Sequence, residues 1–573
     1  MIAETKNCQN CKQNFVIEPE DFDFYAKIKV PPPTFCLQCR RQRRYAWRNE
    51  RVLYRRNCDL CGKSMVTIYS PNKPLKVYCP PCWWGDGWDA KEYAQKFDFS
   101  RPFFEQYREL QLKVPRIALL TKNSVNSEYV NHGSGNKNCY LTFATLDSEN
   151  VLYSTNAFYA RDCMDCYWID ENPELLYECI STYSSYKCQY GILLNGCAEC
   201  LYCYDCRGCS NCFMSSNLRN KQFYIRNRPY SKEQYFEELK KYHLSSRAVR
   251  KQLLAEYKIV CKSALHRFAV IEQSVNVTGN FIFKSKNSQF CFDGNGLEDV
   301  KYCDVVIHAK SSMDSYHFGN NTEWAYEAHG VLACSNASFI HLCYDNAFID
   351  YCDTCHNSQN LFGCIGLKKA SYCILNTQYS PEEYAALRER MVAHMKQTGE
   401  YGEFFPVKFS PFGYNETQAQ IYIPLNADGA HAKGFAWEEN MPGALGKETV
   451  VAIPDDITDV PDSITQEIFV CNTCHRNFNV VPVELDFYRR GQLPIPDQCP
   501  NCRYITRLER RPPRKTWKRP CQCTGAGSEN GIYKNTIEHS HKTAHCPNEF
   551  ETSYAPERPE IVYCEQCYQA EVA

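Results

Sequence analysis

The sequence lacks several features by which a protein of this length is usually classified. No apolar run approaches the roughly 20 residues needed to cross a bilayer, and the first eight residues contain no hydrophobic region of a signal peptide. The sequence also lacks common nucleotide-binding and catalytic motifs: a Gly-rich phosphate loop, G-x-S-x-G, H-E-x-x-H, and H-x-E with P-C-x-x-C. Net charge is −1, so attraction to a polyanion must be local. We therefore expect no membrane association and a binding protein rather than an enzyme, although fold does not fix function.

Cysteine is what the sequence has in excess, with 37 in 573 residues. Without an export signal, this number indicates a reducing cytoplasm and metal binding rather than disulfides. A disulfide-rich extracellular protein is the alternative, but such proteins are usually much smaller. The hydrophobic fraction of 44%, with 14% aromatic residues, is typical of globular chains, and the length predicts several domains.

Two cysteine cassettes, one near each end of the chain, predict four metal sites. Thiolates two residues apart supply soft ligands for tetrahedral zinc, and a short module needs such a metal because its core is too small to fold alone. The two halves of the site are separated by 24 residues in the first module of each cassette and by 17 in the second. We expect about four Zn²⁺ sites, all closed and structural, with no catalytic residue among them. Their ligands are Cys8, Cys11, Cys36 and Cys39; Cys58, Cys61, Cys79 and Cys82; Cys471, Cys474, Cys499 and Cys502; and Cys521, Cys546, Cys564 and Cys567.

The fourth site is irregular at its first ligand. Thr543 stands three residues before Cys546, where the second module has Cys58 before Cys61. We assign the missing ligand to Cys521, with an insertion between it and Cys546. The competing or spare ligands are Cys523, His539, His541 and His545.

An arginine-rich segment follows the first module of each cassette. Residues 36–56 hold eight arginines against one glutamate, and residues 499–520 hold eight basic residues against one glutamate, so each segment carries +7. Aromatic residues interleave both, and arginine with stacking rings is what phosphate and unpaired-base contacts require. The segments therefore predict RNA or DNA binding, with a solvated face or pairing to acidic parts of the same chain as the alternative. The predicted nucleic-acid contacts are Arg40, Arg41, Arg43, Arg44, Arg48, Arg507, Arg510 and Arg511.

Between the cassettes, small polar, cysteine and aromatic residues recur about every twelve residues. Short β segments joined by Asn, Gly, Asp and Ser turns predict two β-solenoid-like repeat units, with one turn made from about two twelve-residue units. A helix start closes each unit: Ser231 and Ser380 are the expected N-caps, and Gln234 and Glu383 occupy the reciprocal capping position.

Six cysteines recur at every third residue from Cys197 to Cys212. Iron–sulfur proteins use similar runs, but there the last spacing is three and a proline follows. Small buried residues that fill a repeat interior are the other interpretation, and the scattered cysteines of the second unit favour it. An iron–sulfur or redox protein built on this tract stays open as an alternative function.

The predicted fold is multi-domain and mainly β, with zinc modules at both ends and short capping helices around the repeats. The acidic stretch at 455–462 lies in a connector that could pack against a basic module. The predicted segments are a treble-clef-type zinc module (1–56), a zinc ribbon (57–98), a linker helix (99–122), repeat unit 1 (123–228), a helical segment (229–269), repeat unit 2 (270–378), a helix (379–400), a Pro/Gly-rich connector (401–466), a second treble-clef-type zinc module (467–512) and a second zinc ribbon (513–573).

Seven stretches carry a resemblance to a known group of proteins. They are residues 8–11, 17–22, 58–62, 98–104, 217–221, 410–417 and 560–564. In these, and along nearly its whole length, the chain resembles the multi-zinc-ribbon, cysteine-rich repeat proteins of candidate-phyla bacteria. The resemblance implies treble-clef or zinc-ribbon ends around a cysteine-rich repeat core, and it implies no particular activity.

These observations together predict a cytoplasmic, zinc-binding scaffold. Its arginine-rich segments would contact RNA or DNA, while the repeat units present a surface to a protein partner. A protein-only assembly platform is the alternative, in which the arginines meet the acidic connector or a partner.

Overall fold

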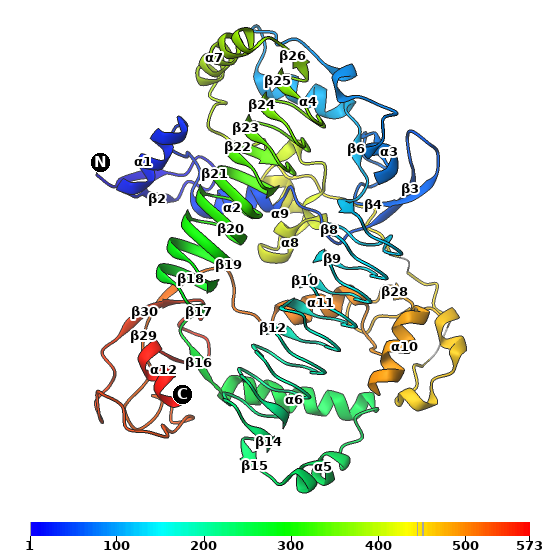
Figure 1. Cartoon of the computed structure of the whole chain (residues 1–573), viewed down its shortest axis with the longest axis vertical. Helices are drawn as coiled ribbons and strands as arrows, with labels where there is room; N and C mark the ends of the chain where they lie inside the picture. The colour runs from blue at the N-terminus through cyan, green and yellow to red at the C-terminus, as the bar shows by residue number, and fades with distance from the viewer. Residues whose placement is uncertain (1, 444, 450–451, 573) are drawn as a thin grey trace. The chain divides into compact units, whose positions relative to one another are not determined.

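The structure, a computed structural model, describes residues 2–443, 445–449 and 452–572 (Figure 1). The chain divides into two compact units, each of which combines one cysteine cassette with one repeat. The N-terminal cassette belongs with the second repeat, and the C-terminal cassette with the first. Unit 1 is Met1–Leu119, Ala269–Met441 and Arg514–Thr516, and unit 2 is Leu120–Phe268, Pro442–Pro513 and Trp517–Ala573.

The first module of each cassette is a two-stranded antiparallel sheet followed by two helices. The elements are β1 (Glu4–Asn7), β2 (Asn14–Ile17), α1 (Pro19–Ile28) and α2 (Leu37–Tyr45) in unit 1, and β27 (Phe469–Val470), β28 (Asn477–Phe478), α10 (Pro482–Gly491) and α11 (Pro500–Leu508) in unit 2. Helices α1 and α10 both have proline at the first helical turn and end on a left-handed residue, Lys29 and Gln492. Helices α2 and α11 have Cys36 and Cys499, two of the predicted metal ligands, at the N-cap. A predicted ligand therefore stands at the start of each of these helices.

The second module of each cassette is a hairpin, a short strand and a helix. The elements are β3 (Tyr54–Asn57), β4 (Ser64–Thr67), β5 (Val77–Tyr78) and α3 (Pro80–Trp84) in unit 1, and β29 (Trp517–Pro520), β30 (Glu549–Thr552), β31 (Ile561–Tyr563) and α12 (Glu565–Val572) in unit 2. Strand β5 pairs in parallel with β6 (Arg116–Ile117), and β31 pairs in parallel with β16 (Leu265–Arg267). Between β5 and β6 lie η1 (Ala90–Tyr93) and α4 (Phe103–Lys113), the latter within the predicted linker helix.

The repeat of unit 2 is a ladder with a register of about twelve residues, in which the strands pair in parallel except for the last pair, β14 with β15. Its strands are β7 (Thr121–Lys122), β8 (Gly133–Ser134), β9 (Phe143–Leu146), β10 (Thr155–Phe158), β11 (Tyr167–Asp170), β12 (Ile180–Tyr183), β13 (Ser210–Phe213), β14 (Gln222–Ile225) and β15 (Arg228–Pro229). Thr155 pairs with Tyr167, and single bridges continue the pairing from Ile180 to Ile192 and on to Tyr204. Consecutive twelve-residue units therefore pair directly, and the prediction of about two units per turn is wrong.

The repeat of unit 1 forms one ten-stranded sheet with the same register (Figure 1). Phe292 pairs with Asp304, and Asp304 with Tyr316. All neighbours are parallel except the last pair, β25 with β26. The strands are β17 (Ile271–Glu272), β18 (Val275–Phe283), β19 (Lys286–Lys301), β20 (Asp304–Met313), β21 (Tyr316–Leu332), β22 (Ser335–His341), β23 (Ala347–Asp350), β24 (Gln359–Phe362), β25 (Ser371–Ile374) and β26 (Thr377–Gln378).

Left-handed backbone at every third residue bends both ladders. Tyr202, Asp205, Gly208 and Asn211 have φ values of 53°, 49°, 60° and 50°. This conformation favours Gly, Asn and Asp. Asp205, Gly208 and Asn211 are such residues and Tyr202 is not, so the turn-forming residues of the sequence pattern mark only part of the bends.

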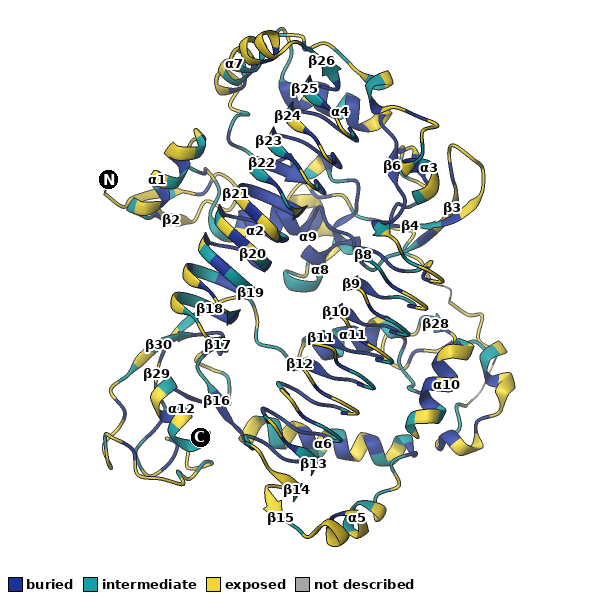
Figure 2. Ribbon diagram, in the orientation of Figure 1, coloured by how far each residue is buried: buried dark blue, intermediate teal, exposed yellow. Residues whose placement is uncertain are grey.

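Every third residue of the ladders is also buried, and Figure 2 shows this interior as a dark-blue lining of the strands. The thiol of Cys203 lies 3.5 Å from the carbonyl oxygen of Leu201 and 3.4 Å from that of Cys212. Ser154 Oγ similarly donates to Leu152 O at 2.9 Å, and accepts the N–H of Cys166 at 3.0 Å. Cysteine and serine therefore suit the interior because they partner backbone groups that burial would otherwise leave unpaired.

Helices follow both ladders, and the two capping predictions are confirmed. Ser231 and Gln234 form a reciprocal capping box at the start of α5 (Lys232–Lys240), and Ser380 and Glu383 form one at α7 (Pro381–Gln397). Helix α6 (Arg247–Ser263) begins after Ser246. Within the described residues, no helix has both the length and the apolar character that crossing a membrane requires.

The connector divides between the two units. Its elements are η2 (Val407–Phe409), η3 (Tyr414–Glu416), α8 (Gln418–Tyr422), α9 (Ala427–Ala432), η4 (Ile457–Asp459) and η5 (Asp462–Gln466). In the acidic stretch, Asp455 accepts the N–H of Ala248 at 3.0 Å in the first turn of α6, and Asp462 pairs with Arg489 of α10 at 2.6 Å. The stretch therefore packs on a helix start and on one arginine of the third module.

Candidate metal centres

Each of the four predicted cysteine sets is brought together by the fold. Within a set, the four Sγ atoms lie within 4.8 Å of one another. A tetrahedron with metal–sulfur bonds of about 2.3 Å has edges of about 3.8 Å. The Sγ–Sγ distances are 3.7 Å for Cys11–Cys36, 3.9 Å for Cys61–Cys79, 3.7 Å for Cys474–Cys499 and 3.9 Å for Cys546–Cys564. All four sets therefore have the dimensions of a four-coordinate thiolate site and can hold a metal ion.

One backbone hydrogen bond recurs in all four sets, from the N–H of the third cysteine to the Sγ of the first. The N–Sγ distances are 3.2 Å for Cys36–Cys8, 3.3 Å for Cys79–Cys58, 3.3 Å for Cys499–Cys471 and 3.2 Å for Cys564–Cys521. Burial raises the pKa of Cys58 and of Cys471, but surrounding backbone N–H groups outweigh burial and lower each pKa to about 7. The first cysteine of each of these two sets therefore favours the thiolate, which is the form that binds metal.

The fourth set differs from the others in burial. Cys11, Cys61 and Cys474, the second ligands of the first three sets, are exposed, whereas Cys546 is buried. Cys521 takes the first position of the fourth set, and all four members are buried. The module that contains the insertion between Cys521 and Cys546 therefore buries all four cysteines of its set, whereas the second module leaves Cys61 exposed.

A second group of ligand atoms adjoins the fourth set. Cys523, His539, His541 and Cys567 also lie within 4.8 Å of one another, and Cys567 belongs to both groups. The sequence predicts Cys523 and the histidines as competing or spare ligands of one site, whereas the fold gathers three of them into a separate group. His545 stays outside it and pairs with Glu529.

The cysteine tract from Cys197 to Cys212 has no such arrangement. All six cysteines are at most 1% exposed, and their thiols lie against backbone carbonyls of the ladder. Over the described part of the chain, none of them falls in a group that could hold a metal ion. The geometry therefore favours packing over an iron–sulfur site.

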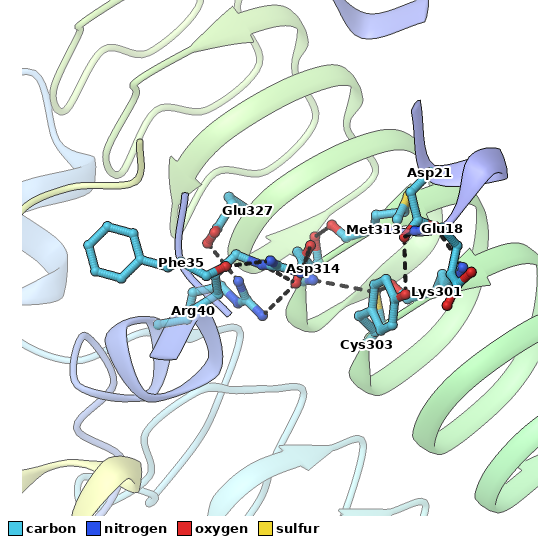
Figure 3. Close-up of polar contacts among 12 residues, drawn as sticks. Glu18, Asp21, Phe35, Arg40, Lys301, Cys303, Met313, Asp314 and Glu327 are labelled. Atoms are coloured by element: carbon cyan, nitrogen blue, oxygen red, sulfur yellow. Dashed lines mark hydrogen bonds and ion pairs between the residues drawn. The ribbon is translucent and has the colours of Figure 1, made fainter. Parts of the chain in front are cut away.

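Helix α2 buries its arginines on the ladder of unit 1. Figure 3 shows Arg40 directed at Asp314, with Glu327 beside it. Arg40 Nε and Nη2 each lie 2.9 Å from a carboxylate oxygen of Asp314, and Arg44 Nη1 lies 2.6 Å from Glu327 Oε2. The other three predicted contacts in this segment are also paired: Arg41 with Asp304, Arg43 with Glu327 and Glu403, and Arg48 with Glu50.

Helix α11 repeats the arrangement in unit 2. Arg503 Nε lies 3.0 Å from Asp165 Oδ2, and Arg507 Nη1 lies 2.8 Å from Asp165 and 2.7 Å from Glu178. Arg510 also pairs with Glu178. Burial raises the pKa of Glu178, but the guanidinium groups of Arg507 and Arg510 outweigh burial and lower it. Arg511 is half-buried with its guanidinium 5.1 Å from the ring centre of Tyr167.

The correspondence between the units extends to a third contact. Asp165 and Glu178 are thirteen residues apart, as are Asp314 and Glu327. In each ladder, a tyrosine lies twelve residues before the aspartate. Its hydroxyl donates to the third residue of the other helix in the same module, which is α10 in unit 2 and α1 in unit 1. Tyr153 donates to Glu484 at 2.7 Å, and Tyr302 donates to Asp21 at 3.1 Å. The same set of three residues therefore receives both cassettes.

These buried ion pairs contradict the prediction that the arginines of the two segments contact RNA or DNA. Arg40, Arg41, Arg43, Arg44, Arg48 and Arg507 are at most 6% exposed. Because their guanidinium groups are buried against carboxylates, they present no surface to a phosphate backbone. Pairing with acidic parts of the same chain, the alternative in the sequence analysis, accounts for them. The carboxylates themselves were missed, and their only sequence signal is the thirteen-residue spacing that recurs in both repeats.

Comparison with protein-family models and with curated proteins finds no match for this chain. Its interpretation therefore depends on the geometry above.

Proposed function

We propose that the chain is a zinc-binding, non-enzymatic scaffold in which each cassette clamps one repeat through a metal-stabilised helix. The observation that carries the proposal is the coupling of ligand and arginine in α2 and α11. Each helix begins after a ligand cysteine and places arginines in buried ion pairs with a ladder, four in α2 and two in α11. Buried pairs stabilise only when their geometry is fixed, because both charges lose their hydration. A metal at the helix start supplies that fixed geometry.

Zinc is the metal that this chemistry favours. All ligands of the four sets are cysteine thiols, the separations fit metal–sulfur bonds of about 2.3 Å, and no position is left open for a substrate. The predicted consequence is that anaerobically purified protein contains zinc, contains no iron and has no visible absorption band. Stoichiometric iron with absorption near about 400 nm, typical of an iron–sulfur cluster, would contradict the proposal.

We infer further that each repeat is a β-solenoid with one twelve-residue unit per turn. Parallel bridges in unit 2 follow four columns, which pass through Ile180, Tyr183, Tyr186 and Gln189. These columns, the bends at every third residue and the buried cysteines and serines support four short sides around a filled interior. Such a body presents extended faces, which repeat proteins use for binding.

The partner that we propose is a protein rather than a nucleic acid. Six of the eight arginines assigned to nucleic acid are buried, and the net charge is −1. Titration of the full chain with labelled single-stranded RNA and duplex DNA at low salt is expected to show no saturable binding. Binding that weakens steeply with salt would restore the nucleic-acid hypothesis, because counterion release gives that dependence.

A further inference from the structure

We propose that the fourth module holds a pair of metal ions bridged by the thiolate of Cys567. This inference rests on the proposed binding of zinc by the cysteine sets, and adds a second ion to one of them. Two groups of four ligand atoms meet in this module, and Cys567 is the member that they share. A thiolate has lone pairs for two metals, so one sulfur can complete both tetrahedra.

The separations in the second group match a mixed sulfur and nitrogen site. Zinc–sulfur bonds of about 2.3 Å and zinc–nitrogen bonds of about 2.0–2.1 Å give a tetrahedral sulfur–nitrogen edge of about 3.6 Å. Cys523 Sγ lies 3.6 Å from His539 Nδ1, and Cys567 Sγ lies 3.4 Å from His541 Nε2. Cys567 Sγ also lies 3.7 Å from Cys546 Sγ of the fourth set, which is the first of the two groups in this module.

Both histidines are oriented as metal ligands usually are, with the second ring nitrogen bound to an acceptor. His539 Nε2 lies 2.8 Å from Glu571 Oε1, and His541 Nδ1 lies 2.7 Å from the carbonyl oxygen of Ala544. Glu571 is itself held by the N–H of Thr536 at 2.8 Å. A carboxylate or carbonyl behind the imidazole fixes the tautomer that leaves the opposite nitrogen free to bind metal.

Hydrogen-bond donors converge on the sulfur of Cys523, as they do on sulfur atoms of the fourth set. The side-chain amide of Asn535 donates to its Sγ at 3.2 Å, and the N–H of Gly525 lies 3.4 Å away. Asn548 donates in the same way to Cys564 Sγ at 3.3 Å in the first group.

Charge balance also favours the second ion. One divalent ion on the four thiolates of the first group leaves a net charge of −2 in a fully buried set. A second divalent ion, bound as Cys523 releases its proton, brings five thiolates and two ions to −1. Buried charge that is not balanced is costly, so the pair suits this closed module better than a single ion.

The second module provides a comparison within the same chain. Cys58, Cys61, Cys79 and Cys82 form one group, and the described residues around them supply no second one. The insertion of the fourth module contributes Cys523, His539 and His541. The additional site is therefore a property of the insertion and not of the ribbon.

The first test is the metal content of the full chain after reconstitution with Zn²⁺ and desalting. We expect five zinc ions per chain in the native protein and in His545→Ala, a neighbouring exposed histidine outside the group. We expect four in the double variant His539→Ala/His541→Ala. Four ions in all three proteins would overturn the paired site while leaving the proposed function intact; no bound zinc would overturn both.

The bridge has its own readout in the native protein. In protein substituted with ¹¹³Cd, we expect two resonances from the fourth module, one of four-sulfur and one of two-sulfur, two-nitrogen type, split by coupling through the shared sulfur. The double variant is expected to lose the mixed resonance and the splitting. Two unsplit resonances, or no mixed resonance in the native protein, would contradict a bridging Cys567.

Discussion

Units 1 and 2 receive their cassettes through the same contacts but differ in the last module of the cassette. Arg40 and Arg44 meet Asp314 and Glu327 in unit 1 as Arg503 and Arg507 meet Asp165 and Glu178 in unit 2. Among the residues that the structure describes, only the second module of unit 2 carries an insertion with further ligand atoms. The shared contacts explain the architecture of both units. A role specific to this protein is better sought where the copies differ, which is the fourth module.

Loss of a metal site is expected to have the largest effect, and the same effect in both units. The double variants Cys36→Ser/Cys39→Ser and Cys499→Ser/Cys502→Ser each remove half of a site and the anchor of one arginine helix. Structural zinc contributes about 10 kcal/mol or more to the folding of isolated fingers, so each variant should lose one zinc and the cooperative unfolding of its own unit in calorimetry. If only one of the two double variants lost the cooperative unfolding of its unit, the two units would not be equivalent and the comparison would fail.

Loss of one buried arginine is expected to cost less. Arg44→Met and Arg507→Met each leave two buried carboxylates without that partner, which typically costs about 3–5 kcal/mol. The free energy of unfolding of each unit, from urea transitions followed by hydrogen exchange, should fall by similar amounts. Lys137→Met is the matched control: it breaks the exposed pair with Glu149 and should leave the free energy of unfolding nearly unchanged, because solvent screens such a pair. Arginine variants as stable as this control would contradict the clamp.

Removal of the tyrosine hydroxyl should destabilise one unit more than the other. Tyr153→Phe takes a hydrogen bond from Glu484, and Tyr302→Phe takes one from Asp21. A hydrogen bond to a charged group contributes about 1.5–3 kcal/mol. Burial raises the pKa of Glu484, although the charge of Arg503 opposes this rise. The charged form of Glu484 therefore depends strongly on the hydrogen bonds that it accepts. We expect the larger loss of unfolding free energy for Tyr153→Phe; equal losses would show that this burial has no consequence.

The smallest effect is expected inside the ladders. Cys203 and Cys352 are both buried with their thiols against backbone carbonyls. Serine occupies equivalent interior positions, so Cys203→Ser and Cys352→Ser should each change the unfolding free energy by less than about 1 kcal/mol. Leucine at either position should cost about 1–3 kcal/mol because it overpacks a filled interior. Serine variants that are as unstable as the leucine variants would indicate that the thiols do more than pack.

Local and duplicated patterns carried most of what could be predicted from the sequence. The paired spacing of the cysteines led to the four sets, and the serines at 231 and 380 led to the helix starts. A period of twelve residues, by contrast, does not reveal how many periods separate paired strands. The ion pairs join residues about 270 or 330 positions apart, and no local signal identifies such partners. Likewise, only folding of the insertion brings Cys523 and His541 to Cys567.

The central claim is that each metal site holds an arginine helix on its ladder, and hydrogen exchange during stepwise zinc removal tests it most directly. The amides of α2 and α11 should be protected in the zinc-loaded chain. They should lose protection together with the zinc of the first and third sites, before the ladder strands do. Helices that stay protected after those two sites are emptied would contradict the account, because the arginines would then hold the cassettes without the metal.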